Sequence, residues 1–208
     1  MSREQLILIG AGGHATSCID VIEQNGQFQV VGLIGLPNEL NTKCLDYPVI
    51  ATDDGLSDLR ASYSYTLITA GQIAEPDTRI RLYRIACDLG FELPSIVAPS
   101  AYVSEHACLG NGTIVMHGAI VNAGVSIGNN CIVNSRTLIE HGAYVNDHCH
   151  ISTGAILNGD VVIGAGSFVG SGSQIKEGIK LGERCIVAMG LSVRHHLSDQ
   201  TKILSDRR

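Results

Sequence analysis

The sequence lacks tryptophan, has few aromatic residues, and contains no apolar run of the roughly 20 residues that a membrane span needs. Its cysteines form no Cys-x-x-Cys pair, which disfavours a thiolate zinc site and predicts free thiols in a reducing compartment. Basic residues are scattered and the formal charge is -6, which argues against nucleic acid or an anionic membrane as partner. The opening stretch MSREQLILIG predicts a first strand rather than a signal peptide. A cytoplasmic protein without a resident metal is expected.

Small and branched side chains are abundant. Hydrophobic residues make up 45% of the 208 residues, and 24 residues are glycine. This combination favours a fold in which backbone segments pack closely, and the length allows one large domain or two modest ones.

The first 94 residues alternate between strand-like and helix-like segments. This β-α-β order predicts a small parallel, Rossmann-like sheet flanked by helices. Gly26 is expected to end the first helix, and Ile80, Tyr83 and Cys87 are expected to form the buried stripe of a later helix. The predicted strands are 5–10, 28–34 and 65–71, and the predicted helices are 16–26 and 76–90.

A glycine-rich loop, GAGGHA at 10–15, lies between the first strand and the first helix. It fits the pattern G-x-G-x-x-G/A, which can hold a phosphate at a helix N-terminus. Dinucleotide binding also needs an acidic residue at the end of the second strand, where this chain has Gly35. NAD is therefore not expected, and a nucleotide-sugar site and a purely structural loop both stay open.

The period changes after the first domain. Every sixth residue from Val97 to Val193 is Leu, Ile or Val, and the residue four positions later is usually small. This repeat predicts a left-handed parallel β-helix over 95–196, with three hexapeptides in a coil of about eighteen residues. The segment 197–208 is expected to be a C-terminal tail.

The coil length predicts which side chains stack on one another. His141 should lie between Ala123 and Gly159, and these small neighbours leave space for a ligand beside the ring. Glu140 should share a polar column with Asn122 and Asn158.

The histidines and cysteines of the repeat region allow other interpretations. His148 and His150 could join His141 in binding a metal, but no carboxylate or thiolate set completes such a site. Inward-facing cysteines of one column are expected to fill the core rather than to act as nucleophiles. These are Cys131, Cys149 and Cys185.

Three segments give the chain a resemblance to a known family, namely LILIGAGGHA, NSRTLIEHG and HISTGAILNGDVVIG. They resemble the NeuD/PglD-type bacterial sugar acetyltransferases of the hexapeptide-repeat superfamily, and the last two are most similar to the sialic acid O-acetyltransferase branch. The resemblance implies a homotrimer, with acetyl-CoA as co-substrate in the groove between adjacent β-helices. It also implies that residues 1–94 bind the acceptor sugar or nucleotide-sugar.

The resemblance also implies roles for single residues. His141 matches the catalytic base, which would take a proton from the attacking acceptor group. Residues matching acceptor contacts are Gly12, Gly13 and His14. Residues matching positions along the acetyl-CoA site are His150, Asn134, Ser152, Gly159 and Gly170.

The chain departs from the family's pattern at two further places. The aminosugar N-acetyltransferase branch has a glutamate directly after the catalytic histidine, where this chain has Gly142, so Glu140, a backbone carbonyl or a group from the next subunit could orient His141. The C-terminal Gly-x-Pro-Ala-Lys/Arg segment is missing, and Arg194 or Lys202 could supply charge toward coenzyme A instead.

Three functions follow as hypotheses. The first is acetyl transfer from acetyl-CoA to a hydroxyl of a sialic acid or related nonulosonate in surface-polysaccharide biosynthesis. The second is acetyl transfer to the amine of a UDP-linked 4-amino-sugar. The third is a non-catalytic partner of a sialic-acid biosynthetic enzyme.

Overall fold

A computed structural model describes residues 3–73 and 75–205 of the chain. It divides into two compact units. The first comprises the chain up to Gly71 together with Asp77–Ile96, and the second comprises Gln72–Pro76 together with the chain from Val97 onward. The sequence did not indicate that the short segment Gln72–Pro76 belongs to the second unit.

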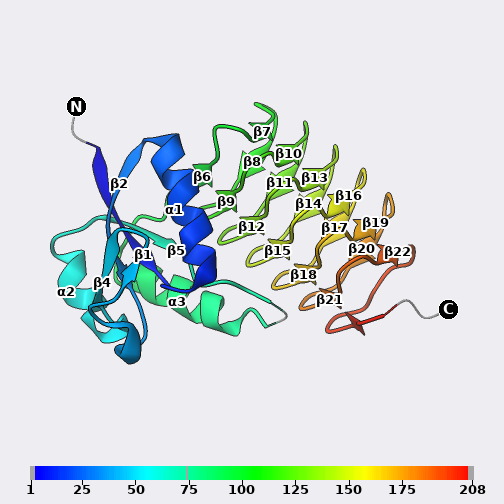
Figure 1. The fold of residues 1–208 in the computed structure, drawn as a ribbon. Helices are drawn as coiled ribbons and strands as arrows, with labels where there is room; N and C mark the ends of the chain where they lie inside the picture. Colours follow the sequence, from blue (N-terminus) through cyan, green and yellow to red (C-terminus); the bar gives the residue numbers. More distant parts are fainter. Residues whose placement is uncertain (1–2, 74, 206–208) are drawn as a thin grey trace. The chain divides into compact units, whose positions relative to one another are not determined.

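The first unit is built on a five-stranded sheet in the order β3-β4-β2-β1-β5 (Figure 1). β1, β2, β4 and β5 are parallel to one another, and β3 pairs antiparallel with β4. This confirms the predicted Rossmann-like fold. The elements are β1 (Glu4–Ile9), α1 (Gly13–Asn25), β2 (Phe28–Ile34), η1 (Pro37–Glu39), β3 (Lys43–Cys44), β4 (Tyr47–Ala51), η2 (Asp53–Gly55), α2 (Leu56–Arg60), β5 (Tyr65–Ile68) and α3 (Asp77–Asp88).

The helix ends show which sequence signals hold. Gly26 has a left-handed φ of 73° and its N–H donates to the Ile22 carbonyl at 3.0 Å, which confirms it as the residue that ends α1. The stripe predicted for α3 is wrong, since Cys87 is exposed.

The buried stripe of α3 instead runs through Arg79, Leu82 and Ala86. The Arg79 guanidinium donates Nη1 hydrogen bonds to the carbonyls of Ile68, at 2.9 Å, and Ala70. These bonds satisfy the buried guanidinium, a group that hydropathy alone would place on the surface. The buried face of α3 is therefore shifted by one residue from the predicted face.

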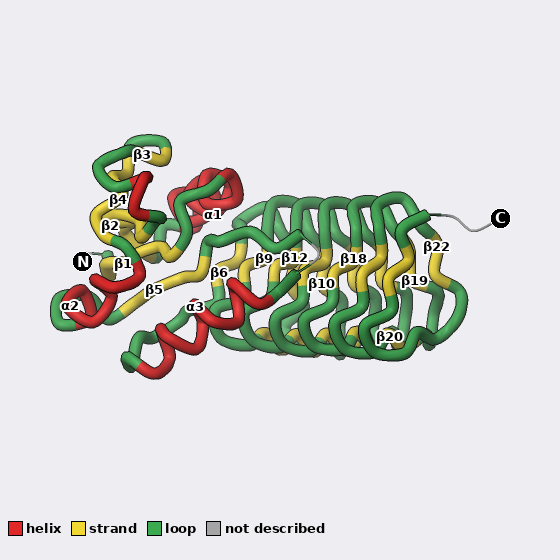
Figure 2. The backbone as a smooth tube through the Cα atoms, turned by 90° about the horizontal axis from the view of Figure 1, so that it is seen from below, coloured by secondary structure: helices red, strands yellow, loops and turns green. Residues whose placement is uncertain are grey.

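The second unit is a left-handed parallel β-helix with three sheets (Figure 2). Residues pair with those of the next coil as predicted, for example Ile120 with Leu138 and Ile132 with His150. One sheet holds β7 (Tyr102–Val103), β10 (Ile120–Val121), β13 (Leu138–Ile139), β16 (Ile156–Leu157), β19 (Gln174–Ile175) and β22 (Ser192–Val193). A second holds β8 (Cys108–Leu109), β11 (Ser126–Ile127), β14 (Tyr144–Val145), β17 (Val162–Ile163) and β20 (Lys180–Leu181). The third holds β6 (Ile96–Val97), β9 (Ile114–Val115), β12 (Ile132–Val133), β15 (His150–Ile151), β18 (Phe168–Val169), β21 (Ile186–Val187) and β23 (Lys202–Ile203).

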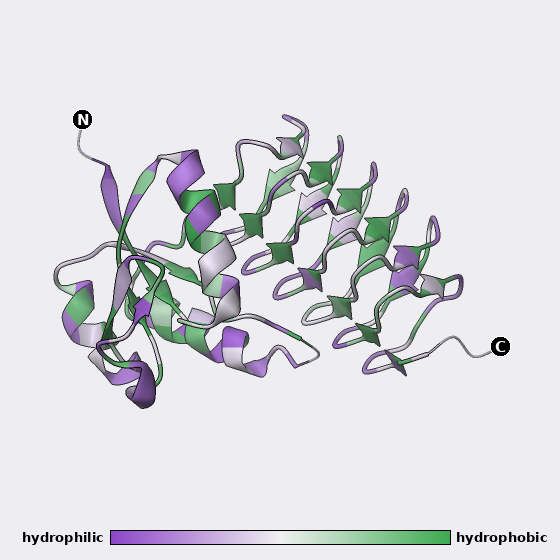
Figure 3. Cartoon of the chain, viewed as in Figure 1, coloured by the Kyte–Doolittle hydropathy of each residue, from purple (hydrophilic) through white to green (hydrophobic). Residues whose placement is uncertain are grey.

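The six-residue repeat fills the inside of the prism. Hydrophobic residues recur on the strands of successive coils (Figure 3), and the aliphatic residues from Val115 to Val193 that follow the repeat are buried. Cys131, Cys149 and Cys185 are buried in the same cluster, as predicted for core positions. Burial raises the pKa of the Cys149 thiol well above its ordinary value, and the neighbouring Cys131 thiol adds to the rise.

The predicted tail is partly ordered into the β-helix. β23 pairs with β21, and Leu197 bridges to Leu181, so the last coil continues past residue 196. This coil is shorter, since Ile186 pairs with Lys202 rather than with a residue eighteen positions later. A prediction built on a strict period of six therefore ends too early.

The buried thiols predict a pattern of chemical reactivity. Burial raises the pKa of Cys18 from 9.0 to about 12, although the Arg79 charge opposes the rise. Since the thiolate is the reactive form, Cys18 should resist a thiol reagent from pH 7 to 9, as should the other buried cysteines. In a time course with Ellman's reagent, exposed Cys87 and Cys108 should react at once, and all seven cysteines only after unfolding in urea. Fast labelling of Cys18 in the folded protein would contradict this burial.

Candidate functional site

The glycine loop of the first unit leaves open space at the start of α1. Gly12 is the N-cap residue and Gly13 begins the helix, and a Cβ built on either would meet nothing within 4 Å. The first turn holds no acidic residue. The start of α1, with the positive end of the helix dipole, therefore borders a space that an anion can enter. His14 follows on the same turn, and its Nε2 lies 3.4 Å from Cys18 Sγ.

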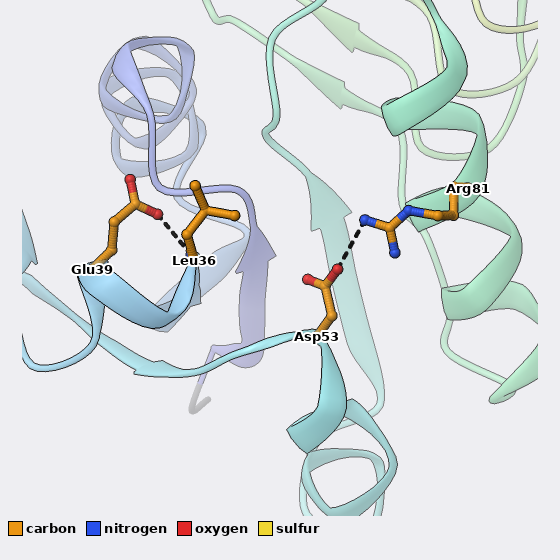
Figure 4. A network of polar contacts seen from close by, with 4 residues as sticks. All are labelled: Leu36, Glu39, Asp53 and Arg81. Atoms are coloured by element: carbon orange, nitrogen blue, oxygen red, sulfur yellow. Dashed lines mark hydrogen bonds and ion pairs between the residues drawn. The ribbon is translucent and has the colours of Figure 1, made fainter.

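A carboxylate that the sequence did not reveal lies at the end of β2. A Cβ on Gly35 would lie 2.8 Å from Glu39 Oε2 and 3.3 Å from the Ala11 Cβ, so Glu39 folds back toward the glycine loop. Its Oε2 accepts a hydrogen bond from the Leu36 N–H at 2.7 Å (Figure 4). The acid that Rossmann-like folds use at this strand end is absent at position 35 but is supplied in space by Glu39.

On the β-helix, the His141 ring lies against Gly159 of the next coil, as the stacking rule predicts. A Cβ on Gly159 would lie 2.7 Å from His141 Cε1 and 2.9 Å from Nε2. The side chain is exposed. A glycine at 159 is thus required for this ring position, which leaves the imidazole open to a substrate.

Glu140 is held by a neighbouring coil. Its Oε2 accepts a hydrogen bond from Asn122 Nδ2 at 2.9 Å, which confirms the predicted polar column on that side. Asn158 of the same column uses its own Nδ2 on the Ile175 carbonyl at 2.7 Å. The Glu140 carboxylate is therefore bonded to Asn122, and its role in orienting His141 stays a prediction.

His150 is only 7% exposed and is enclosed by its own unit. Its Nδ1 donates to the Gln72 carbonyl at 2.6 Å, so Nε2 accepts from Asn134 Nδ2 at 3.1 Å. The ring also meets Phe168 edge-on, with centroids 5.2 Å apart. His150 fastens the Gln72–Pro76 segment to the β-helix, and its contact with acetyl-CoA stays a prediction.

The other residues assigned to the acetyl-CoA site lie on neighbouring coils. Ser152 Oγ lies 2.9 Å from Ser171 Oγ, and Gly170 is buried beneath the coil above, where a Cβ would clash with Val187 O at 2.7 Å. The corner beside them is unobstructed, since a Cβ on Gly154, Gly172 or Gly190 would meet nothing within 4 Å.

The described residues contain neither a metal-ligand cluster nor a membrane-spanning helix. No cluster of three or more His, Cys, Asp or Glu in the described ranges is arranged to hold a metal ion. Within the same ranges, no helix combines the length and the apolarity that crossing a membrane requires.

Comparisons with known proteins match both units. Residues 5–85 match the PglD N-terminal domain, and residues 160–194 match the hexapeptide repeat of succinyl-transferase. No curated protein matches the sequence.

Several solved structures share nearly the whole chain. A mutant of perosamine N-acetyltransferase from Caulobacter crescentus, in complex with CoA and GDP-perosamine, has a TM-score of 0.92 and 29% identity, covering 99% of this chain and 96% of that one. The acetyltransferase domain of PglB from Neisseria gonorrhoeae FA1090, in complex with acetyl coenzyme A, has a TM-score of 0.89 and 26% identity, covering 99% and 98%. WeeI from Acinetobacter baumannii AYE shares the fold, with a TM-score of 0.82, 18% identity and 98% of each chain covered.

These matches confirm the predicted fold and the predicted acyltransferase class. They do not reach the sialic acid branch, which stays a prediction.

Proposed function

We propose that this protein transfers the acetyl group of acetyl-CoA to the amine of a nucleotide-linked amino sugar. The observation that carries the proposal is the exposed His141 imidazole, held against Gly159 on the β-helix face. Similar structures that bind CoA or acetyl coenzyme A support the co-substrate, and a perosamine N-acetyltransferase bound to GDP-perosamine supports the acceptor class.

His141 acts as the general base in this proposal. The acceptor amine attacks the thioester carbonyl, a C–N bond forms, and the imidazole takes the proton that the nitrogen loses. The C–S bond then breaks, and the same proton returns to the coenzyme A sulfur. No acyl-enzyme is needed, because the cysteines of the β-helix core are buried.

One corner of the β-helix surface has the shape and the polar groups that the pantetheine arm of coenzyme A needs. The glycine corner of Gly154, Gly172 and Gly190 offers no side chain to obstruct a narrow, linear chain. Hydroxyl groups of Ser152 and Ser171 lie on the coils beside it. We assign the pantetheine arm to this corner, with Asn134 and Gly159 on the same unit.

The glycine loop and Glu39 support a nucleotide on the acceptor. Gly12 and Gly13 present backbone N–H groups at the start of α1, where a diphosphate is stabilised. Glu39 lies at the end of the neighbouring strand, where a carboxylate can accept hydrogen bonds from ribose hydroxyls. His14, on the same turn, is assigned to the acceptor as well.

The test is acetyl transfer from radiolabelled acetyl-CoA to a panel of acceptors. The panel contains a UDP-linked and a GDP-linked amino sugar, CMP-sialic acid and free sialic acid. We expect label on a nucleotide-linked amine. Label on none of the nucleotide-linked amines, with measurable acetyl-CoA binding, would contradict the proposed acceptor.

A second candidate acceptor is a sialic acid hydroxyl. Gly142 favours it, because the glutamate of the aminosugar N-acetyltransferase branch is absent and the left-handed φ of 68° does not suit one. Label on sialic acid alone would select it. Absence of acetyl-CoA binding by calorimetry would select a non-catalytic partner of a sialic-acid biosynthetic enzyme instead. We also propose a cytoplasmic homotrimer, and a monomer in sedimentation velocity would contradict that assembly.

Glu39→Gln should weaken nucleotide binding. Loss of the carboxylate removes a charged acceptor, so the Kd for UDP or GDP, whichever binds wild type, should rise about tenfold in calorimetry. Asp53→Asn is the matched control, because Asp53 pairs with Arg81 at 2.9 Å on the surface (Figure 4). That exposed pair contributes little, so the control should bind as wild type does. Equal Kd values for both variants would remove Glu39 from the site.

A further inference from the structure

The turn after His141 places a carboxylate from the next coil where a side chain at position 142 would lie. Gly142 has a left-handed φ of 68°. A Cβ built on it would lie 3.3 Å from Asp160 Cγ and closer still to Oδ1. The left-handed φ disfavours an acidic side chain at position 142, and the Asp160 carboxylate occupies the space that its Cβ would take.

Two other aspartates also bring a carboxylate oxygen close to a glycine of the preceding coil, but each is bonded to the residue that follows that glycine. Asp147 Oδ1 accepts a hydrogen bond from the Asn129 N–H at 2.7 Å, and Asp199 Oδ1 accepts one from the Glu183 N–H at 2.9 Å. Both carboxylates cap the backbone of the preceding coil. Across residues 3–73 and 75–205, no side-chain hydrogen bond engages the Asp160 carboxylate, so it keeps its acceptor capacity.

Asp160 is also tied to His141 along the backbone. Its N–H donates to the His141 carbonyl at 3.0 Å. The imidazole ring of His141 lies against Gly159, the residue before Asp160. Glu140, the other carboxylate nearby in sequence, is bound to Asn122 at 2.9 Å. Among the described residues, Asp160 is thus the carboxylate beside His141 on which neither oxygen accepts a side-chain hydrogen bond.

We propose that Asp160 is a positioning residue for His141. In this proposal its carboxylate turns from the space at position 142 to accept a hydrogen bond from one imidazole N–H when the acceptor binds, and so fixes the tautomer whose other nitrogen takes the proton of the acceptor. The expected effect on rate rests on the proposed function, whereas the proposed hydrogen bond between Asp160 and the imidazole is tested without it.

Asp160→Asn tests the proposal with little risk to folding. Asparagine has the same shape and tolerates the left-handed φ of 59° that Asp160 adopts. We expect kcat to fall at least about tenfold, with the KM for acetyl-CoA within about twofold of wild type. In a His141→Ala background the same change should cause no further loss, because its effect passes through the imidazole. Asp147→Asn is the matched control and should keep the wild-type kcat.

A second readout does not depend on turnover. With ¹⁵N-labelled histidine, Asp160→Asn should change the tautomer ratio of the His141 imidazole in NMR spectra, and Asp147→Asn should not. An unchanged ratio, or equal fractional losses of kcat with and without His141, would overturn the proposal. A wild type inactive on every acceptor, combined with a changed ratio in Asp160→Asn, would sink the proposed function and support the contact.

Discussion

His141→Ala is expected to lower kcat for acetyl transfer by about 10²- to 10⁴-fold, the usual contribution of a general base. The loss follows because neither residue next to His141 in the sequence can replace the base. Glu140 is engaged with Asn122, and position 142 is a glycine. The measurement is a steady-state assay with radiolabelled acetyl-CoA and the acceptor that the panel selects.

The same variant separates chemistry from binding. The His141 side chain is exposed, so its truncation should leave the thermal midpoint and the Kd for acetyl-CoA near the wild-type values. His106→Ala is a suitable control on another coil, because its imidazole has no place in the proposed site. A His141→Ala enzyme that keeps more than about a tenth of wild-type kcat would show that the amine is deprotonated without this base.

The β-helix was predictable almost residue by residue because a single period fixes it. Once Val115 and Ile139 point inward, the six-residue spacing fixes the direction of each neighbour, and the coil length fixes what lies above it. His141 against Gly159 and Glu140 beside Asn122 follow from that rule alone. The rule fails only at the last coil, where the repeat shortens.

The first unit was less predictable because its site depends on turns rather than on a period. Glu39 reaches Gly35 only because a short 3-10 helix begins at Pro37 and reverses the chain. The sequence does not show where the Glu39 side chain points. It therefore predicts no acidic residue at the end of β2. Likewise, hydropathy could not place Arg79 inside, because its burial depends on two carbonyl acceptors that belong to a different element.

The position of Asp160 was predictable from the sequence, but the role that we propose for it was not. The eighteen-residue rule places it above Gly142, but only the left-handed turn shows that its carboxylate occupies the space of the missing side chain. A residue absent from one position in a solenoid can therefore be replaced by one a full coil away. Sequence comparison at single positions does not detect such a replacement.

Glycine at position 164 should be the most sensitive point of the stack. A Cβ on Gly164 would collide with the carbonyl group of Gly182 in the coil above, and neither backbone can yield without breaking the ladder. Gly164→Ala should lower the free energy of unfolding by about 3 kcal/mol or more. At about 2–4 °C for each kcal/mol in a chain of this size, the thermal midpoint should fall by roughly 10 °C in calorimetry.

Gly178→Ala is the matched control, because it isolates backbone strain from collision. Gly178 has a left-handed φ of 67°, but a Cβ there would meet nothing within 4 Å. The strain alone should cost about 1 kcal/mol, so its midpoint should fall by only a few degrees. If both variants melt together, the coils tolerate an added methyl at position 164, and the close stacking that sets His141 against Gly159 is looser than the structure shows.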